Sequence, residues 1–271
     1  MEYTTKLLPP TEDTLRTAAA ALRRGELVGM PTETVYGLAA NAYDPCAVAK
    51  IFQAKGRPQD NPLIVHIADL AVLYEIASSV GKTAEQLAEN FWPGPFTMIL
   101  PKSEKIPECV TAGLDSVAVR MPSHPVAAAL IRESGLPLAA PSANLSGRPS
   151  PTKAGHVYDD LHGKIPYIID GGSCKIGVES TVVKVMDNKV LLLRPGAVTA
   201  EQIRALGIET EIAEAVEAPL KEGETVLSPG MKYKHYAPKA RVVIVDGTID
   251  SFSSYVRLHS DEHTYALVFD G

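Results

Sequence analysis

Two basic residues at the end of a predicted helix are the clearest candidates for chemistry in this sequence. Lys55 and Arg57 flank Gly56, which allows a left-handed turn, and two prolines and Asn61 follow before an apolar strand. Because Arg grips oxygens in a planar fork and Lys acts as a point charge, this pair suits a polyphosphate. A solvated helix C-terminus is the commoner explanation of such a pair. The stiff loop beside a buried strand favours the anion site.

Two further loops concentrate hydroxyl groups and small residues. The segment 31–38 (PTETVYGL) follows a short apolar strand, and the segment 141–152 (PSANLSGRPSPT) follows another strand and precedes a helix. Backbone N–H groups of such a loop, together with a helix N-terminus, can hold an anion. A plain connector rich in Asn, Ser and Pro explains the composition equally well, so both alternatives stay open.

Other candidate side chains lie on or beside predicted strands. Ser116 and Arg120 are four residues apart on one strand and therefore share a face. The segment 179–181 (EST) begins another strand, and Arg194 ends a third. Each arginine taken singly is also explained as a surface charge. His66 lies inside an apolar strand, where a satisfied core histidine is more frequent than a catalytic one.

Several familiar catalytic and cofactor motifs are absent from the sequence. It contains no GxxxxGK[ST], no GxGxxG after a strand, no GxSxG and no HExxH. The three cysteines, Cys46, Cys109 and Cys174, are far apart, and His and Cys never cluster at metal-ligand spacing. We therefore expect no disulfide framework, no protein-bound metal and a cytoplasmic location.

The composition limits the class of protein. The chain has 271 residues, with 26 Lys and Arg against 32 Asp and Glu, so its net charge of −6 requires any anion site to be local. No run of 18 apolar residues predicts a membrane span, and the N-terminus lacks the pattern of a secretory signal. The length indicates one large domain plus part of a second.

Predicted helices and strands alternate along the chain, which is typical of an α/β fold. Helices are expected at 11–24, 44–56, 70–78, 83–92, 125–133, 199–207 and 251–258. Strands are expected at 27–30, 63–67, 96–100, 117–121, 137–140, 167–170, 181–185, 190–193, 241–246 and 265–269. Capping boxes that begin at Thr83 and Thr199 mark two of the helix starts.

Long sequence strings, in order, carry a family resemblance. They are PTETVYGLAANA, KGRPQDNPLIVHI, WPGPFT, VAVRMPSHP, APSANLSGRPSPT, GVESTVV, LLRPG and SPGMKYKHYAP. Together they cover about residues 10–240 and resemble the long form of the threonylcarbamoyl-AMP synthase family, which has a YrdC-like catalytic domain, a linker and a C-terminal domain.

The resemblance implies a fold, a reaction and partners. The fold is a twisted YrdC-like α/β sheet with helices and a concave face, followed by a linker and a partial Rossmann-like domain. The reaction joins L-threonine, bicarbonate and ATP, with Mg²⁺ on the phosphates, into threonylcarbamoyl-AMP and pyrophosphate. A separate transferase then passes the threonylcarbamoyl group to tRNA, and any contact with the tRNA itself is expected to be weak or transient.

The resemblance also divides the candidate residues between two substrates. Lys55 and Arg57 are the expected catalytic pair. The residues expected to bind ATP are Lys55, Arg57, Asn61, Ser116, Ser142, Asn144, Ser150, Arg194 and Tyr236. The residues expected to form the L-threonine pocket are Thr32, Thr34, His66, Arg120, Ala140 and Ser180, and Ser116 is a candidate there too. Because its guanidinium can bond bidentately, Arg120 is expected to bind the substrate carboxylate.

The expected domain boundaries follow from the same resemblance. Residues 1–210 form the catalytic domain, and 211–239 form a linker in which Tyr236, with His235, closes over the nucleotide. A plain linker is the alternative. Residues 240–271 are expected to begin a small C-terminal α/β domain that the long form continues.

Two other functions compete with the synthase. One is an RNA-binding module, which the net charge and a small-molecule pocket disfavour. The other is a carbamoyl-transfer domain of the hydrogenase-maturation type, but this sequence lacks the acylphosphatase and zinc-finger regions of such proteins.

Overall fold

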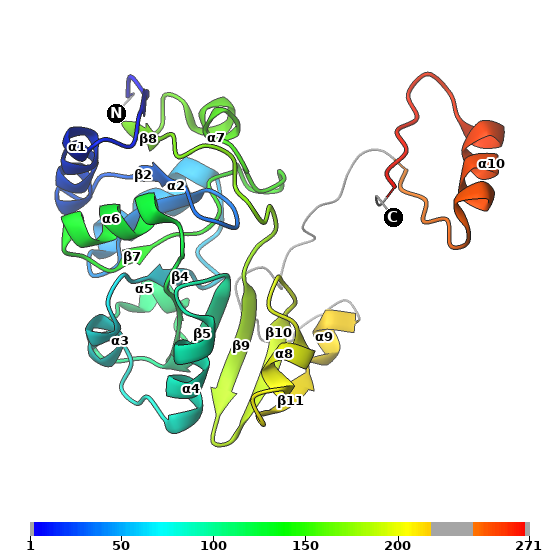
Figure 1. The fold of residues 1–271 in the computed structure, drawn as a ribbon. Coiled ribbons are helices and arrows are strands. Elements are labelled where there is room, and N and C mark those ends of the chain that lie inside the picture. The colour runs from blue at the N-terminus through cyan, green and yellow to red at the C-terminus, as the bar shows by residue number, and fades with distance from the viewer. Residues whose placement is uncertain (1–2, 218–240, 269–271) are drawn as a thin grey trace. The chain divides into compact units, whose positions relative to one another are not determined.

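A computed structural model describes residues 3–217 and 241–268 of the protein. The chain divides into two compact units, Met1–Tyr236 and Ala237–Gly271 (Figure 1). The first unit alternates helices and strands, which confirms the predicted α/β class. In the described part of the chain, no helix is long and apolar enough to cross a membrane.

The first unit is built on a sheet of eleven described strands. The strands are β1 (Lys6–Leu8), β2 (Val28–Met30), β3 (Gly37–Asn41), β4 (Ile64–His66), β5 (Phe96–Pro101), β6 (Ser116–Arg120), β7 (Leu138–Ala139), β8 (Tyr167–Ile169), β9 (Thr181–Met186), β10 (Lys189–Arg194) and β11 (Glu209–Ile212). The helices are α1 (Glu12–Arg23), α2 (Pro45–Lys55), α3 (Leu70–Ile76), α4 (Lys82–Phe91), α5 (Glu108–Thr111), α6 (Pro125–Ser134), α7 (Ala154–Leu161), α8 (Ala200–Arg204) and α9 (Glu214–Glu217).

The sheet mixes parallel and antiparallel neighbours in the order β1-β8-β2-β3-β7-β4-β6-β5-β9-β10-β11. β4 runs parallel to β6 with His66 opposite Arg120, and β5 runs antiparallel to β6 with Thr97 opposite Arg120. Residues directly opposite on neighbouring strands point to the same face. The register therefore brings His66, Arg120 and Thr97 together on one face of the sheet.

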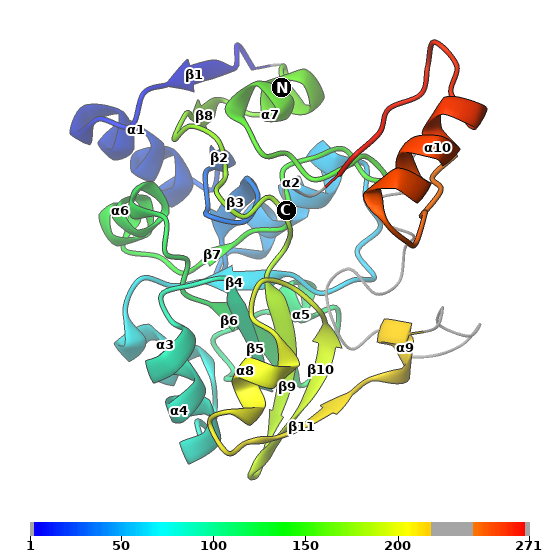
Figure 2. The same ribbon diagram turned by 45° about the vertical axis from the view of Figure 1, so that its right-hand side comes forward.

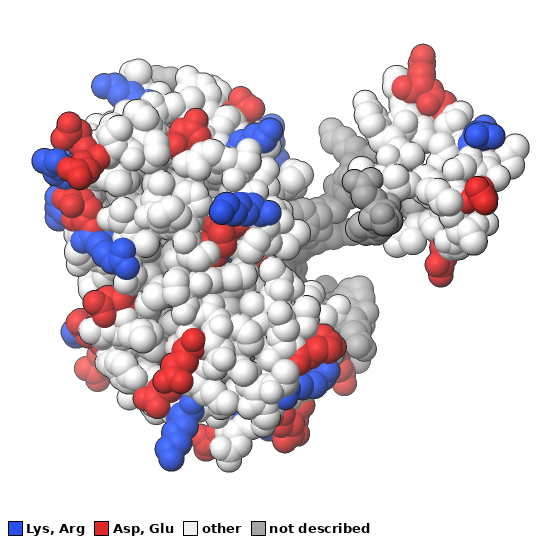
Figure 3. Space-filling view, viewed as in Figure 1, with Lys and Arg blue, Asp and Glu red and all other residues white. Residues whose placement is uncertain are grey.

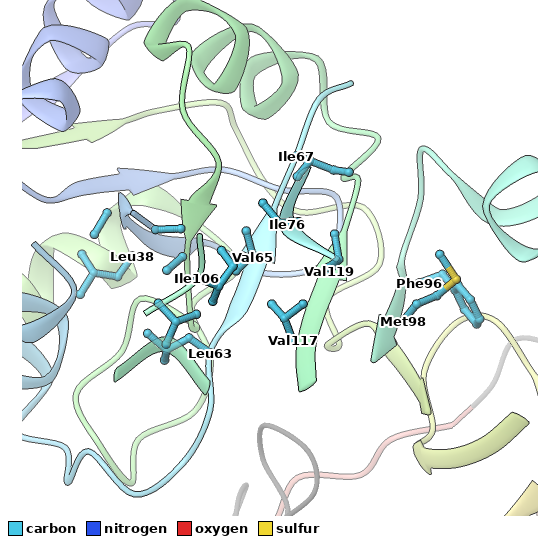
Figure 4. Packing of buried hydrophobic residues seen from close by; sticks show 14 of the residues in the cluster. Leu38, Leu63, Val65, Ile67, Ile76, Phe96, Met98, Ile106, Val117 and Val119 are labelled. Carbon is cyan, nitrogen blue, oxygen red and sulfur yellow. The ribbon is translucent and has the colours of Figure 1, made fainter. Parts of the chain in front are cut away.

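Helices pack on this sheet differently in its two halves. α1 and α6 pack on one face of β2, β7 and β8, whereas α2 and α7 belong to the larger core cluster (Figure 2). In the other half, α3, α4 and α8 join the same large cluster and bury Val65, Val119 and Met98 of the central strands (Figure 4). Because side chains alternate along a strand, His66 and Arg120 lie on the opposite face from these helices. That face carries a smaller apolar cluster, made of Ile64, Ile99, Ala118, Val182 and Leu193.

Local sequence signals explain several helix ends. The Asp44 side chain accepts a hydrogen bond from the N–H of Cys46 at the start of α2, and Gly56 ends that helix with φ of +60°. The predicted capping box at Thr199 is confirmed at α8. The box predicted at Thr83 is wrong, because α4 already begins at Lys82 and Thr83 lies inside its first turn.

Some elements are missed by the sequence reasoning. β1 and β11 are short, and neither has the apolar run that marks the other strands. β3 begins inside the segment 31–38 that was expected to be a loop, because Gly, Ala and Leu carry no strong strand signal there. The boundary expected at residue 210 falls inside β11, which pairs with β10, so the first compact unit extends past it.

The second unit contains α10 (Ile249–His259), which begins at the capping residue Thr248 and buries none of its side chains. The strands predicted at 241–246 and 265–269 are wrong for the described residues, which form no ladder. Ile244 and Leu267 are 91% and 93% exposed. An apolar segment becomes a strand only when a partner strand and a covered face are available. The Rossmann-like arrangement stays a prediction.

Candidate active site

A pocket on the first unit brings most of the predicted site residues together. It lies where the loop before β3 meets the C-terminal ends of β4, β6 and β10. The predicted residues that line it are Thr32, Thr34, Arg57, His66, Arg120, Ala140, Ser142, Ser180 and Arg194. The other lining residues are Val35, Gly37, Pro62, Leu63, Ile64, Pro141 and Glu179. Residues assigned to ATP and to L-threonine thus share one pocket.

Arg120 is a buried cation held by three protein groups. Its Nη2 lies 2.7 Å from Glu33 Oε1, its Nη1 donates to Thr34 Oγ1 at 2.9 Å, and its Nε donates to Gly94 O at 3.3 Å. Gly94 sits in a tight turn, where an added Cβ would come within 2.4 Å of Phe91 O. These contacts fix the guanidinium plane before any ligand arrives.

Glu33 supplies the countercharge for Arg120. Both side chains are nearly fully buried, at 5% and 4% exposure. Burial alone would raise the pKa of Glu33, but the charge and hydrogen bonding of Arg120 outweigh it and hold the pKa below its ordinary value. Backbone N–H groups of Glu33 and Ser123 also lower the pKa of this carboxylate. The contact is therefore a short buried ion pair that balances the charge of Arg120 inside the protein.

His66 faces the pocket as a neutral imidazole. Burial and the nearby charge of Arg120 lower its pKa to about 3. Its Nδ1 lies 3.3 Å from Ile64 O, and the carbonyl accepts when the proton is on Nδ1. In that tautomer Nε2 carries a lone pair, which would make His66 a hydrogen-bond acceptor at this wall.

Thr32 and Thr34 form a closed hydroxyl network beside Arg120. Thr32 Oγ1 donates to Val35 O at 2.5 Å and lies 2.9 Å from Thr34 Oγ1. The Thr32 oxygen also accepts from the backbone N–H groups of Thr34 and Val35, and Thr34 Oγ1 accepts from Arg120. The two threonines therefore hold Arg120 in place and leave an acceptor lone pair on Thr34.

Ser180 and Arg194 form the facing wall. Arg194 donates through Nε to Ser180 O at 3.0 Å and through Nη2 to Ser180 Oγ at 3.1 Å. Ser180 Oγ also lies 2.8 Å from Thr97 Oγ1. The approach of β10 to β9 needs Gly196, where an added Cβ would lie 2.5 Å from the N of Thr181.

Lys55 lies behind the pocket wall, outside the lining residues. It is 3% exposed, and its Nζ donates to Ser142 O, to Asn144 O and to Asn144 Oδ1. Burial and the neighbouring charge of Arg57 lower its pKa to about 7, against a smaller opposing effect of Asp160. Asn144 also accepts from Ser142 Oγ at 2.6 Å. Lys55 thus orders the 142–144 loop from behind.

Arg57 lines the pocket from the loop after α2. Its Nη2 donates to Asn61 O at 3.3 Å, and its guanidinium lies 6.0 Å from the centre of the Phe52 ring. Asn61 is 1% exposed, and its Oδ1 has no hydrogen-bond partner among the described residues. The hydrogen bond to Asn61 O therefore orients the Arg57 guanidinium and stabilises the backbone of the loop after α2.

The remaining predicted residues lie away from the pocket lining. Ser150 Oγ donates to Glu179 Oε1 at 2.5 Å, so Ser150 stands directly behind a lining carboxylate. Ser116 lies at the start of β6, four residues before Arg120 and opposite Pro101. Tyr236 and His235 lie outside the described residues. The assignment of each residue to ATP or L-threonine stays a prediction.

Sequence reasoning missed three residues that the structure places at the site. Glu33 and Glu179 stand inside strings already singled out, but a carboxylate in a site expected to bind anions was not assigned a role. Thr97 gave no signal, because a threonine in a strand is ordinary. Only its register with Arg120 reveals it.

The distribution of charged and metal-ligating side chains limits which ions the protein can bind. In the ranges 3–217 and 241–268, no three His, Cys, Asp or Glu side chains form a group that could hold a metal ion. On the face shown in Figure 3, basic and acidic side chains are interspersed. The arginines that line the pocket, Arg57, Arg120 and Arg194, supply positive charge there in a protein whose net charge is −6.

Comparison with known families divides the chain into two parts. The family model described as "Telomere recombination" (Sua5, YciO and YrdC) matches residues 20–196. The model described as "Threonylcarbamoyl-AMP synthase, C-terminal domain" matches residues 198–269. The two matches follow each other in the order of the long form.

Three curated relatives are named threonylcarbamoyl-AMP synthase. A threonylcarbamoyl-AMP synthase of Pyrococcus abyssi is 54% identical over 87% of this chain and 69% of its own length. One from Bacillus subtilis is 55% identical over 85% of this chain and 66% of its own length. One from Schizosaccharomyces pombe is 45% identical over 90% of this chain and 67% of its own length. The chain spans about two thirds of these relatives.

Solved structures share the fold. A crystal structure of P. abyssi Sua5 complexed with L-threonine has a TM-score of 0.87 and 51% identity, and covers 93% of this chain and 74% of its own. Escherichia coli YciO has a TM-score of 0.66 at 23% identity over 74% of this chain and 99% of its own, which supports the fold alone. With these sequence matches, the chain belongs to the threonylcarbamoyl-AMP synthase family, in its long form.

Proposed function

We propose that this chain forms threonylcarbamoyl-AMP and pyrophosphate from L-threonine, bicarbonate and ATP, and so acts as a nucleotidyltransferase in tRNA threonylcarbamoyladenosine formation. Its family membership supports the activity, and the P. abyssi relative was crystallised with L-threonine. The observation that carries the proposal is the shared pocket, where the Arg120–Glu33 pair and His66 stand together with Arg57 and Arg194.

The proposed reaction has two bond-forming steps. The amine of L-threonine attacks the carbon of bicarbonate, and loss of water leaves a carbamate. A carbamate oxygen then attacks the α-phosphorus of ATP, and the bond to pyrophosphate breaks. Negative charge is present throughout, so the protein acts mainly by positioning the reactants and stabilising charge.

The wall made by Arg120, Thr34 and His66 is proposed to bind L-threonine. Arg120 is held rigidly and lines the pocket, so its guanidinium charge suits a carboxylate. His66 is neutral and offers a lone pair, which suits the ammonium or hydroxyl of the substrate. A site that bonds the hydroxyl would reject valine, since a buried polar group would stay unpaired.

The loop side of the pocket is proposed to bind the ATP phosphates. Arg57 and Arg194 line it, and the 142–144 loop is ordered by Lys55. Mg²⁺ is proposed to arrive with ATP as part of the substrate, because Mg²⁺ is usually held by one or two carboxylates and by substrate phosphates. No step depends on a metal bound to the protein beforehand.

The product also implies a partner. Threonylcarbamoyl-AMP is a mixed anhydride that water destroys, so it must be shielded and passed on promptly. A downstream tRNA threonylcarbamoyl transferase is the proposed recipient, and direct contact of this chain with tRNA is proposed to be weak or transient.

The test is threonine-dependent release of pyrophosphate from MgATP in the presence of bicarbonate. The purified protein should release it, and Arg57→Ala should lower kcat/KM for ATP about 10- to 100-fold, since a charge-assisted hydrogen bond is worth about 1.5–3 kcal/mol. Arg16→Ala, which changes an exposed arginine of α1, is the matched control. Absence of threonine-dependent pyrophosphate in active, folded protein would contradict the proposal.

A further inference from the structure

Thr97 is a buried hydroxyl directly beneath the pocket. It is 0% exposed and lies on β5, in register with Arg120 of β6 and Val182 of β9. Its side chain therefore lies on the sheet face that carries His66 and Arg120. Its Oγ1 is 2.8 Å from Ser180 Oγ, and it has no other hydrogen-bond partner among the described residues.

The direction of this hydrogen bond follows from counting protons. Ser180 Oγ already accepts from Arg194 Nη2 at 3.1 Å. If Ser180 also donated to Thr97, the Thr97 proton would be buried with no acceptor, which is costly. If Thr97 donates instead, its proton is satisfied, and Ser180 uses both lone pairs to accept. Among the described residues no acceptor remains for the Ser180 proton, so we expect its partner in the pocket, which Ser180 lines.

We infer that Thr97 is a positioning residue that turns the Ser180 hydroxyl into an obligatory donor towards the substrate. This inference rests on the proposed function and sharpens it. A Ser180 oxygen that accepts two hydrogen bonds cannot also accept one from an ammonium group. Ser180 therefore receives an oxygen of L-threonine, from its carboxylate or its side-chain hydroxyl. The substrate ammonium belongs at the opposite wall, where His66 and Thr34 offer lone pairs.

Two substitutions of Thr97 separate this role from simple packing. Thr97→Val keeps the shape and removes the donor, so Ser180 is free to rotate. Its dissociation constant for L-threonine, measured by calorimetry, should rise about 5- to 20-fold, which corresponds to one lost hydrogen bond. Thr97→Ser keeps the donor and removes a buried methyl group. It should bind L-threonine within about twofold of the wild type while its Tm falls.

Thr97→Val should thus lose affinity for L-threonine, whereas Thr97→Ser should keep that affinity and lose stability. Affinity for MgATP should change less than about twofold in Thr97→Val, because Arg194 stays bonded to Ser180 O. Thr210→Val is the control, since Thr210 is buried and its hydroxyl donates to Ile208 O, away from the pocket. L-2-aminobutyrate, which lacks the hydroxyl, identifies the bonded oxygen. An equal loss of its affinity in Thr97→Val assigns the carboxylate, and an unchanged affinity assigns the hydroxyl.

Two results would overturn the inference. Thr97→Val could bind L-threonine within twofold of the wild type, or Thr97→Ser could lose affinity as much as Thr97→Val does. Both leave the proposed function intact as long as the wild type releases pyrophosphate. Failure of the proposed function is seen separately, as wild-type protein that neither binds L-threonine nor releases pyrophosphate.

Discussion

Lys55 and Arg120 are buried cations at two sides of one pocket, and they differ in whether a carboxylate balances their charge. Arg120 is paired with the Glu33 carboxylate at 2.7 Å, so its charge is balanced inside the protein. Among the described residues, Lys55 donates to uncharged oxygens of Ser142 and Asn144, and its pKa falls to about 7. A paired cation is a fixed binding group. An unbalanced one with a pKa near 7 is only partly charged at neutral pH, and a bound anion favours its charged form.

The difference follows from where each cation is placed. Arg120 ends a central strand, where the neighbouring strands and the loop before β3 surround it with partners. Lys55 is the last residue of α2, beside a loop whose carbonyl oxygens turn inward. We therefore expect the Arg120 side to select L-threonine with a preformed geometry. The Lys55 side is expected to respond to the charge of ATP.

Removal of the countercharge at Glu33 should have the largest effect. Glu33→Gln leaves Arg120 buried without a carboxylate, and breaking a buried pair in this way costs about 3–5 kcal/mol. We expect that loss in the free energy of unfolding, measured in urea, together with loss of L-threonine binding.

Two further variants test the cause. Glu33→Gln combined with Arg120→Met should regain most of the stability but none of the binding, because no buried charge remains. Glu75→Gln breaks an exposed ion pair with Lys105 and should cost only about 0–1 kcal/mol. Equal losses in Glu33→Gln and Glu75→Gln would show that the Arg120 charge is not desolvated.

The sequence predicts a site residue well when a contiguous motif contains it, and poorly when its role depends on partners distant in the chain. His66, Arg120 and Ser180 were predicted from motif strings, and all three line the pocket. Lys55 was expected among the phosphate ligands, but spacing along the chain does not reveal that its ammonium points to the 142–144 loop. Thr97 was not predicted for the same reason, since its place beside the pocket depends on the register of β5 with β6. Partners that are distant in sequence decide these roles.

The fold shows the same limit. Runs such as 63–67 and 181–185 became strands because neighbouring strands and helices covered them. The equally apolar runs 241–246 and 265–268 did not, and Ile244 stays 91% exposed. A hydrophobic pattern indicates that a segment can form a strand. It does not reveal whether another strand is available to pair with that segment.

Removal of the Lys55 ammonium should give an intermediate effect of another kind. Lys55→Met deletes the hydrogen bonds that order the 142–144 loop, so kcat/KM for ATP should fall about 10- to 100-fold. The free energy of unfolding should stay within about 1 kcal/mol, because the cost of burying the ammonium disappears too.

The matched control for Lys55→Met lies on the same helix. Lys50 also donates to a backbone carbonyl, Gly25 O at 2.7 Å, but away from the pocket. Lys50→Met should leave the kinetics for ATP unchanged. A loss of stability in Lys55→Met as large as in Glu33→Gln would remove the distinction between the two cations.

The smallest expected effect is on the pH dependence of ATP binding, and it tests the charge of Lys55 directly. The pKa of Lys55 is lowered to about 7, so the free protein carries this charge below pH 7 and loses it above. Anion binding favours the charged form, so MgATP affinity should fall as the pH rises above 7, by at most about tenfold per unit. Calorimetric titrations between pH 6 and 9 measure this, and Lys55→Met should abolish it.

Asp160 allows the midpoint of that profile to be moved. Its charge raises the pKa of Lys55, so Asp160→Asn should shift the midpoint to lower pH and weaken MgATP binding a few-fold at pH 7. Asp159→Asn, at the exposed neighbouring position, is the control and should leave the midpoint in place. The same midpoint in wild type and Asp160→Asn would mean that another group titrates. The contrast between a balanced Arg120 and an unbalanced Lys55 would then fail.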